Sequence, residues 1–454
     1  MGERKVGKRQ KIVRIAGDML KGIGILAGGS ILGILLLTAV YLLPVSPMKE
    51  NVARSSAIFD YEGVYPQLVQ GYKASQLDNC TDAIMIGIAA YSEETADGIR
   101  NAAALAMDAR RVEFRGDDPV RSLNDYANDV EGKEERKQVV GYTRYWHGYL
   151  IPLKLLLLFF DYGDIRFLNL FAQFFLTGWL MILMLEKGRK RLLIPFSILI
   201  CVLNPVAEAM SLQFSSVYYI TLVSMLLILR GKEEKMIRCA ACFFFCIGVL
   251  TSFFDLLTYP LLTLGVPLTL MFLLFEGRME EKLLLLVKAC CTWGLGYAGM
   301  WGCKWLVASI LLQRNIFSDA YQQILLRSSM QSDGSALQWG EVIWRNMRVL
   351  LRWPYLFLFV GAGIVLLKKV WGVGLKDKVC SALLFGIPFF LIALIPVIWF
   401  CILGNHSYEH YWFTYRALGI SCFALLAYLA ELPHFLKKGN ESAAYVRIAA
   451  YGEM

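Results

Sequence analysis

Residues 22–44, GIGILAGGSILGILLLTAVYLLP, form an apolar run of 23 residues without a charge. A helix of this length crosses the roughly 30 Å hydrocarbon core of a bilayer, and it is longer than the apolar segment of a cleavable signal peptide. Seven Lys and Arg residues precede the run, within residues 1–21. The pattern predicts an uncleaved signal anchor, residues 22–44, that follows a basic cytoplasmic N-terminus, residues 1–21.

The composition of the whole chain indicates a membrane protein. Of its 454 residues, 57% are hydrophobic and 18% are charged, whereas soluble proteins average about 45–50% and about 25%. This composition excludes an ordinary soluble enzyme, a disordered chain and a disulfide-rich scaffold. We therefore expect an all-α polytopic membrane helical bundle of about ten transmembrane helices. The expected spans after the anchor lie in a membrane body, residues 165–432, and are 165–186, 191–208, 210–230, 237–256, 259–277, 283–311, 348–370, 379–403 and 411–432.

The charge is divided unevenly along the chain. Residues 45–146 carry a net charge of −5, and the rest of the chain carries +14. Because basic loops stay on the cytoplasmic side of a membrane, we expect residues 45–164 to form an extracytoplasmic first loop. The same rule places the tail, residues 433–454, in the cytoplasm. No basic patch with interleaved aromatic residues lies outside the short membrane-flanking loops, so we expect no nucleic-acid partner.

A short apolar segment, residues 149–160, determines the orientation of every later loop. Its roughly 12 residues are too few to cross a bilayer. We expect an interfacial helix lying flat on the outer surface, because a crossing here would turn the later basic loops outward. Three outer segments then meet above the membrane: residues 45–164, 313–347 and 404–410.

Four carboxylates of the first loop are candidate catalytic groups. Asp78 and Asp82 are four residues apart, so on a helix they share one face. Such a pair can act as a general base, bind a cation or orient a sugar hydroxyl. The alternative is a helix N-cap, with Asn79, Thr81 or Asp82 accepting backbone N–H bonds. Asp60 and Glu62 form a second, closely spaced pair.

The end of the first loop, residues 142–149 (YTRYWHGY), is rich in aromatic residues. An interfacial aromatic belt accounts for the Tyr and Trp residues, Trp146 among them. It does not account for Arg144 and His147 between them. Aromatic rings beside hydrogen-bonding groups suit a sugar ring, so both interpretations remain open.

Charged residues inside apolar spans are a stronger signal, because each costs several kcal/mol unless it is paired or hydrated. Lys304 lies in the outer half of its expected span, and Arg416 lies about one turn inside the last span. His406 and His410 lie in the outer turn before Arg416. Lys304, Arg416 and His410 could together bind an anionic lipid headgroup. The alternative for the two long side chains is snorkelling to the interface.

Several functional motifs are absent from the sequence. It contains no P-loop, dinucleotide-binding fingerprint, HExxH or GxSxG motif. Cys239, Cys242 and Cys246 share a helical face with no His or acidic companion, so we expect no metal site there. No long internal repeat is apparent, which disfavours a secondary transporter.

Four segments carry a resemblance to a known family. They are EGVYP (62–66), LDNCTDA (77–83), RYWHGY (144–149) and residues 406–416. With the anchor and the large acidic first loop, they resemble bacterial polytopic glycosyltransferases of the GT-C superfamily, in particular those of Gram-positive bacteria. The resemblance implies a polyprenyl-phosphate sugar donor and a catalytic Asp or Glu in the first outer loop. The matching positions are Asp60, Glu62, Asp78 and Asp82.

The chain departs from the family in one respect. The frequent Asp-Glu or Asp-x-Asp pair is not reproduced, and Asp60-Tyr61-Glu62 is the nearest form. The identity of the base among the four carboxylates is therefore open.

The resulting hypothesis is an inverting glycosyltransferase of the bacterial plasma membrane, with a cell-envelope glycan or lipid as acceptor. Asp82 or Asp78, and after them Glu62 or Asp60, would act as the base. Lys304, Arg416 and His410 would stabilise the departing polyprenyl phosphate, with His406, Arg144, His147 and Trp146 near the substrate. A divalent cation, Mg²⁺ or Mn²⁺, is compatible with this chemistry, although no ligand spacing supports it. The alternative is a flippase for lipid-linked oligosaccharides or another polytopic transporter.

Overall fold

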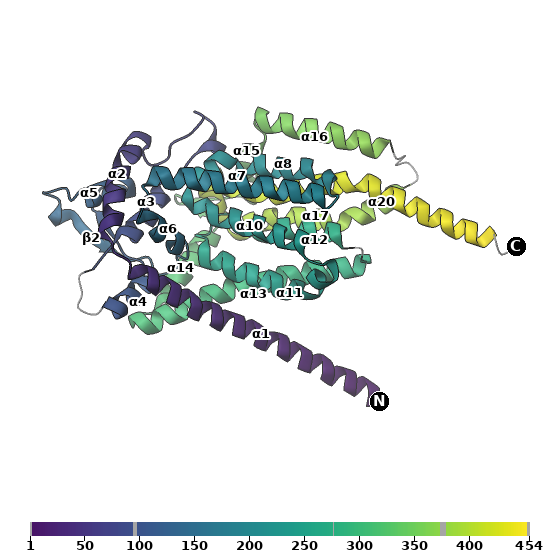
Figure 1. Cartoon of the computed structure of the whole chain (residues 1–454), viewed down its shortest axis with the longest axis horizontal. Coiled ribbons are helices and arrows are strands. Elements are labelled where there is room, and N and C mark those ends of the chain that lie inside the picture. Colours follow the sequence, from purple (N-terminus) through teal and green to yellow (C-terminus); the bar gives the residue numbers. More distant parts are fainter. Residues whose placement is uncertain (1, 94–97, 276, 373–377, 452–454) are drawn as a thin grey trace.

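The computed structural model describes residues 2–93, 98–275, 277–372 and 378–451, and they form an all-α polytopic bundle. A polar layer, residues 46–160, covers one end of the bundle (Figure 1). The N-terminal end of α1 and the C-terminal end of α20 lie at the opposite end, here called the far end (Figure 1). The long helices are α1 (Gly2–Tyr41), α7 (Tyr162–Glu186), α10 (Leu212–Arg230), α11 (Glu233–Phe254), α13 (Met279–Leu312), α16 (Trp353–Trp371), α17 (Val379–Ile402) and α20 (Gly419–Tyr451).

Among the described residues, eight segments are long and apolar enough to cross a membrane. They match the anchor and seven of the nine later spans expected from the sequence. The two remaining expected spans, 191–208 and 259–277, form shorter helices. They are α8 (Leu193–Leu203) with α9 (Pro205–Met210), and α12 (Leu262–Leu274).

Although α8 and α9 are short, together they bring the chain from the end of α7 back to the level at which α7 begins. Asn204 adopts a left-handed conformation (φ 57°) between them and ends α8 before Pro205. The next helix, α10, begins where α7 begins, because the Asp82 carboxylate accepts hydrogen bonds from both Leu212 N and the Tyr162 hydroxyl. The segment 191–208 therefore reverses the chain direction even though neither of its helices is long.

The other short helix, α12, lies inside the bundle. Its 13 residues rise only about 20 Å, and nearly all of them are buried. The indole nitrogen of Trp293 on α13 donates to the Thr263 hydroxyl at 3.0 Å. Surrounding protein, instead of lipid, thus covers a helix too short to span the membrane.

Small helices and one hairpin build the polar layer. Residues 79–90 and 98–108 form α3 and α4, and residues 111–114 are a strand. That strand pairs antiparallel with β2, with Arg111 opposite Val140. The elements are α2 (Ser46–Glu62), α3 (Asn79–Ala90), α4 (Gly98–Asp108), β1 (Arg111–Phe114), α5 (Pro119–Ala127), β2 (Lys137–Val140) and α6 (Leu150–Leu157).

Helix α6 occupies the segment 149–160 that the sequence indicated as interfacial. It has only 8 residues, which is far too short to cross a bilayer. Its Lys154 is fully buried and donates from Nζ to the carbonyl of Ala89 at 2.6 Å. This bond ties α6 to α3.

A second group of small elements lies near the same end of the bundle, between α13 and α20. Its residues fall largely within the two outer segments expected from the sequence, 313–347 and 404–410. Its elements are α14 (Ile316–Ser328), β3 (Gln331–Ser332), β4 (Ser335–Ala336), α15 (Trp339–Leu350), α18 (Gly404–Glu409) and α19 (Tyr411–Thr414).

Basic residues follow or end α7, α10 and α16 at the far end (Figure 1): Lys187, Arg230, Lys368 and Lys369. Arg191 there pairs with Glu431 of α20 at 3.1 Å. The positive-inside rule predicts that these basic residues lie on the cytoplasmic side. Lys376 and the side chains of residues 1–16, 18 and 438–454 lie outside the described part of the chain.

Helices α11 and α13 approach each other closely where glycines face the partner's backbone. A Cβ atom on Gly248 would lie 2.2 Å from the backbone oxygen of Trp293, and one on Gly296 would lie 2.2 Å from that of Phe245. Small residues allow such close backbone approach in membrane helices. Because glycine has no Cβ atom, these two positions let the backbones of α11 and α13 approach without a clash.

We expect Gly248→Ala to destabilise the protein by about 1–3 kcal/mol, because the new methyl group would push α11 away from α13. Gly294→Ala is the matched control, since a Cβ at Gly294 meets nothing within 4 Å and alanine favours a helix over glycine. Thermal unfolding in detergent measures both variants. Equal unfolding temperatures for the two would contradict the close packing.

Candidate functional site

The Asp82 carboxylate is completely buried where α3 meets the first turn of α10. It accepts hydrogen bonds from the Tyr162 hydroxyl at 2.6 Å and from the backbone N–H groups of Leu212 and Gln213 at 2.9 and 3.2 Å. A helix N-terminus presents such unpaired N–H groups and favours negative charge. Burial nevertheless raises the pKa of Asp82 to about 7, and the hydrogen bond from Tyr162 opposes this shift.

Asp78 lies one helical turn earlier and is also buried. It is the N-cap of α3 and accepts from Thr81 N at 3.0 Å and from the Thr81 hydroxyl at 2.9 Å. The side-chain amide of Gln213 also donates to it. Burial raises the pKa of Asp78. The sequence suggested Asn79, Thr81 or Asp82 as the cap of this helix, whereas the structure places the cap at Asp78. Asp78 and Asp82 together join α3 to α10.

Asp82 gives the pH dependence of stability a predictable component. Its pKa is about 7 in the folded protein against an ordinary 3.8. Between these values the folded protein holds a proton that the unfolded chain releases, so this contribution to stability falls as the pH rises. Each unit of difference between the folded and unfolded pKa values changes the free energy of unfolding by about 1.4 kcal/mol.

In Asp82→Asn this component is absent. We expect the unfolding temperature of the variant to rise relative to that of the wild type when the pH is increased from about 4 to about 7. Other buried groups titrate in both proteins, so the difference isolates Asp82. Thermal unfolding at several pH values measures it. A difference that stays constant with pH would contradict the raised pKa.

Glu62, at the C-terminal end of α2, belongs to a charged network that reaches the surface. Arg166 of α7 donates from Nη1 to both Glu62 oxygens at 2.9 Å and from Nη2 to the Asn79 side-chain oxygen at 2.6 Å. The Asn79 amide in turn donates to Glu62 at 2.9 Å. The Glu62 side chain is 19% exposed, whereas Arg166 is 5% exposed. The network therefore fixes the orientation of a carboxylate that solvent can still reach.

Asp60 lies two residues earlier and lines a hollow of about 610 Å³ in the polar layer. The Asn124 amide donates to its carboxylate at 2.6 Å. The other polar groups of the hollow come mainly from α5 and the residues beside it: Asp118, Arg121, Asn124, Asp125 and Asn128. Carboxylates and amides in an open hollow offer hydrogen bonds to a polar ligand.

Arg416 forms a buried ion pair at the centre of the bundle. Its Nε lies 3.2 Å from a carboxylate oxygen of Glu208, and both side chains are fully buried. Arg416 also donates to the carbonyl of Leu203 at 2.8 Å, and the Tyr259 hydroxyl donates to Glu208. These contacts join α8 and α9 to the turn before α12 and to the turn before α20.

Lys304 is completely buried where α13 meets α4. Its Nζ donates to the carbonyls of Met107 at 2.9 Å and Ala106 at 3.3 Å. These carbonyls belong to the last turn of α4, where helical carbonyl groups have no partner of their own. Lys304 thus caps α4 and connects the polar layer to the bundle.

The segment 144–149 also attaches the polar layer to the bundle. Trp146 is buried and donates from Nε1 to the carbonyl of Met300 at 2.7 Å. His147 is buried in a left-handed conformation (φ 57°) and contacts the carbonyl of Tyr142 at 2.7 Å. Burial lowers the pKa of His147 to about 3, so the ring is neutral. Arg144 remains partly exposed and pairs with Asp319 at 3.1 Å.

His406 and His410 lie side by side on and just after α18, with ring centroids 5.0 Å apart. Arg327 of α14 contacts Nδ1 of His406 at 3.2 Å and Nε2 of His410 at 2.6 Å. Burial lowers the pKa of His410 to about 4 and that of His406 well below its usual value. Both rings are therefore neutral near pH 7 and accept hydrogen bonds from the guanidinium group.

The predicted site residues divide into separate groups. Asp78, Asp82 and Glu62 lie close together around Asn79, while Asp60 faces the hollow. Lys304, Arg416 and His410 have no hydrogen-bond partner in common, so the structure does not bring them together as one headgroup site.

Sequence analysis did not select four residues that the structure makes central. Tyr162, Arg166 and Gln213 contact the first-loop carboxylates, and Arg327 contacts both histidines. Arg166 offered a signal, because it is a cation next to the start of a long apolar run. The other three carry no sequence pattern that reveals their partners.

The residues described by the structure contain no group of three or more His, Cys, Asp or Glu side chains placed to hold a metal ion. A Mg²⁺ ion needs only one or two carboxylates when substrate phosphate and water supply its other ligands. The present residues could therefore assist a cation that a substrate brings but could not form a complete protein cage for one.

Comparisons of the chain with protein-family models, with curated proteins and with solved structures find no match.

Proposed function

We propose that this protein is an inverting membrane glycosyltransferase, which moves a sugar from a polyprenyl-phosphate donor to a cell-envelope glycan or lipid on the outer face of the membrane. Support comes from the resemblance of the four sequence segments to GT-C enzymes. It comes also from an architecture that combines a polar layer with an apolar bundle. Glu62 lies at the junction of these two parts.

The observation that carries the proposal is the orientation of Glu62. A general base must be reachable by the acceptor hydroxyl. Glu62 meets this need, because 19% of its side chain stays exposed while Arg166 holds the carboxylate from one side. Asp82 and Asp78 are buried, so an acceptor hydroxyl does not reach them, and we assign them to holding α3 against α10. Asp60 is the second choice.

In the proposed reaction, Glu62 accepts the proton of the acceptor hydroxyl. The acceptor oxygen then bonds to the anomeric carbon, and the bond from that carbon to the phosphate oxygen breaks. Charge at the anomeric carbon develops as in other glycosyl chemistry. Polyprenyl phosphate leaves with the electron pair of the broken bond, and the transferred sugar has the inverted configuration.

Transfer assays test the proposal directly. Purified protein in nanodiscs is given a panel of radiolabelled polyprenyl-phosphate sugars, with membrane extracts as the source of acceptor, in the presence and absence of EDTA. We expect label to appear in acceptor material, and the EDTA arm reports whether a divalent cation is needed. Binding or scrambling of the lipid-linked sugars without transfer of any donor would overturn the proposal and favour the flippase.

A further inference from the structure

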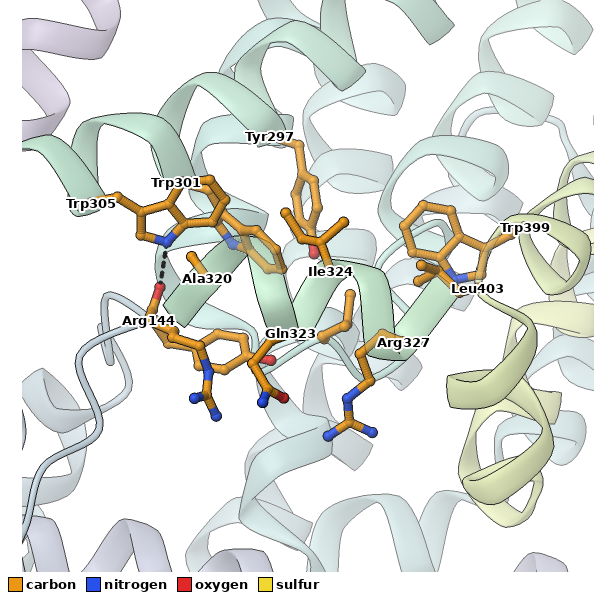
Figure 2. Close-up of a pocket in the computed structure, with 12 residues that line it drawn as sticks. Arg144, Tyr297, Trp301, Trp305, Ala320, Gln323, Ile324, Arg327, Trp399 and Leu403 are labelled. Atoms are coloured by element: carbon orange, nitrogen blue, oxygen red, sulfur yellow. Dashed lines mark hydrogen bonds between the residues drawn. The ribbon is translucent and has the colours of Figure 1, made fainter. Parts of the chain in front are cut away.

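A pocket between α13, α14 and α17 has features of a ligand site that differs from the Glu62 network. Its volume is about 110 Å³. Tyr297, Trp301 and Trp305, spaced four residues apart on α13, line one wall (Figure 2). Arg144, Gln323 and Arg327 point their polar ends in a common direction on the opposite side (Figure 2). The pocket thus has an aromatic wall and a polar, cationic mouth.

Arg327 has no acidic partner in the described part of the chain. Its hydrogen-bond acceptors there are the ring nitrogens of His406 and His410, which carry no charge. They orient the guanidinium group without neutralising it. A planar guanidinium group that is held in this way is well suited to a phosphate oxygen.

Two buried polar atoms on the aromatic wall lack partners. The Tyr297 hydroxyl and the Trp301 indole nitrogen have no hydrogen bond within the described residues, and Tyr297 is only 8% exposed. By contrast, the Trp305 nitrogen in the same row donates to the carbonyl of Arg144 at 3.0 Å. Buried polar groups usually have partners. An oxygen-rich ligand in the pocket would supply them.

The surroundings of the pocket suit an amphiphile. A volume of about 110 Å³ corresponds to a few water molecules at about 30 Å³ each, so it fits a headgroup and not a whole lipid. Helix α14 carries exposed apolar side chains next to the pocket: Phe317 at 44%, Tyr321 at 61% and Leu325 at 51%. An apolar helix face at the edge of a membrane bundle contacts acyl chains.

We propose that this pocket binds the phosphate headgroup of a membrane amphiphile, with Arg327 and Arg144 facing the phosphate, Tyr297 and Trp301 donating to its oxygens, and the acyl chains lying along α14. This proposal does not depend on the proposed transfer reaction. It names a lipid site for which none of the first-loop carboxylates is required.

Two carboxylates near the pocket would repel a bound anion, and they reduce the net positive charge of its mouth. Asp319 pairs with Arg144 through Nη1, and its side chain is 48% exposed. Asp255 is buried and accepts from the backbone and the hydroxyl of Thr258. Arg327 is the cation that neither carboxylate contacts, so it carries most of the expected affinity.

Native mass spectrometry and thermal unfolding of the full-length protein in detergent test the site with phosphatidylglycerol. Diacylglycerol with the same acyl chains controls for the phosphate, and inorganic phosphate controls for the chains. We expect phosphatidylglycerol to bind and stabilise, and Arg327→Gln to weaken its binding by at least about tenfold, as for a lost hydrogen bond to a charged group. Arg348→Gln removes an exposed cation of α15 outside the pocket, and it should leave binding unchanged.

Tyr297→Phe gives a second test, which remains informative even if Arg327→Gln fails to fold. It removes a buried hydroxyl that has no partner, so the lipid-free variant should unfold at the same or a higher temperature than the wild type. Its stabilisation by phosphatidylglycerol should nevertheless be smaller. The proposal would be overturned by equal binding of diacylglycerol, by equal stabilisation by inorganic phosphate, or by equal losses in Arg327→Gln and Arg348→Gln.

Discussion

Glu208→Gln is expected to destabilise the protein by about 3–5 kcal/mol, because the substitution leaves the buried guanidinium group of Arg416 without a counter-charge. The two side chains are 3.2 Å apart and both are fully buried. The hydrogen-bond acceptors of Arg416 are backbone carbonyls, Leu203 O among them, and its other contacts are with aromatic rings, so none of them carries a counter-charge.

Thermal unfolding of detergent-solubilised protein, followed by size-exclusion chromatography, measures this effect. Asp129→Asn is the matched control. It also exchanges a carboxylate for an amide, but in a pair with Lys49 whose Asp129 side chain is 82% exposed. Surface pairs of this kind contribute about 0–1 kcal/mol.

A double-mutant cycle separates the ion pair from the effect of each substitution alone. In Glu208→Gln combined with Arg416→Gln, no buried charge remains uncompensated. The double variant should therefore be less destabilised than the sum of the two single variants. Strict additivity, or a Glu208→Gln protein as stable as Asp129→Asn, would show that the pair does not hold the bundle together.

The sequence was sufficient to predict the long helices, because each contains an apolar run as long as the thickness of a bilayer requires. Residues 22–44, for example, correspond to the apolar part of α1. It was not sufficient for the expected spans 191–208 and 259–277. An apolar run has the same appearance whether lipid or protein surrounds it, and α12 is surrounded by protein.

The sequence identified the candidate residues of the site by their type, but it did not predict their burial or their contacts. The spacing of Asp78 and Asp82 placed them on one face of a helix, and the structure has Asp78 as the N-cap of α3 and Asp82 in its first turn. Their burial depends on Gln213, more than one hundred residues later in the chain. No local pattern encodes such a contact, because it forms only when α10 packs against α3.

The same reasoning applies to the membrane cations. Charge and position in a span identified Lys304 and Arg416 as unusual residues. Several acceptors satisfy a buried cation equally well: a lipid phosphate, a carboxylate or a helix C-terminus. The structure supplies a helix C-terminus for Lys304 and a carboxylate for Arg416, and both choices depend on tertiary packing.

Glu62→Gln is expected to reduce sugar transfer by at least about a hundredfold, because the amide cannot accept a proton from the acceptor hydroxyl. The amide nearly preserves the shape of the side chain and can still accept one hydrogen bond from Arg166. Since Glu62 is partly exposed and Arg166 also contacts Asn79, the variant should remain folded. Transfer by nanodisc-reconstituted protein is compared with the unfolding temperature of the same preparation.

Two carboxylate variants make this experiment specific. Asp60→Asn changes the neighbouring pair member, which faces the hollow of the polar layer and not Arg166. It should keep most of the transfer activity. Asp82→Asn should alter stability and its pH dependence more than the transfer rate of the folded fraction, because Asp82 is buried and bonded to Tyr162 and α10. A Glu62→Gln protein with normal transfer, beside an inactive but folded Asp60→Asn or Asp82→Asn, would move the base to the other carboxylate. An active triple variant would instead exclude all three as the base.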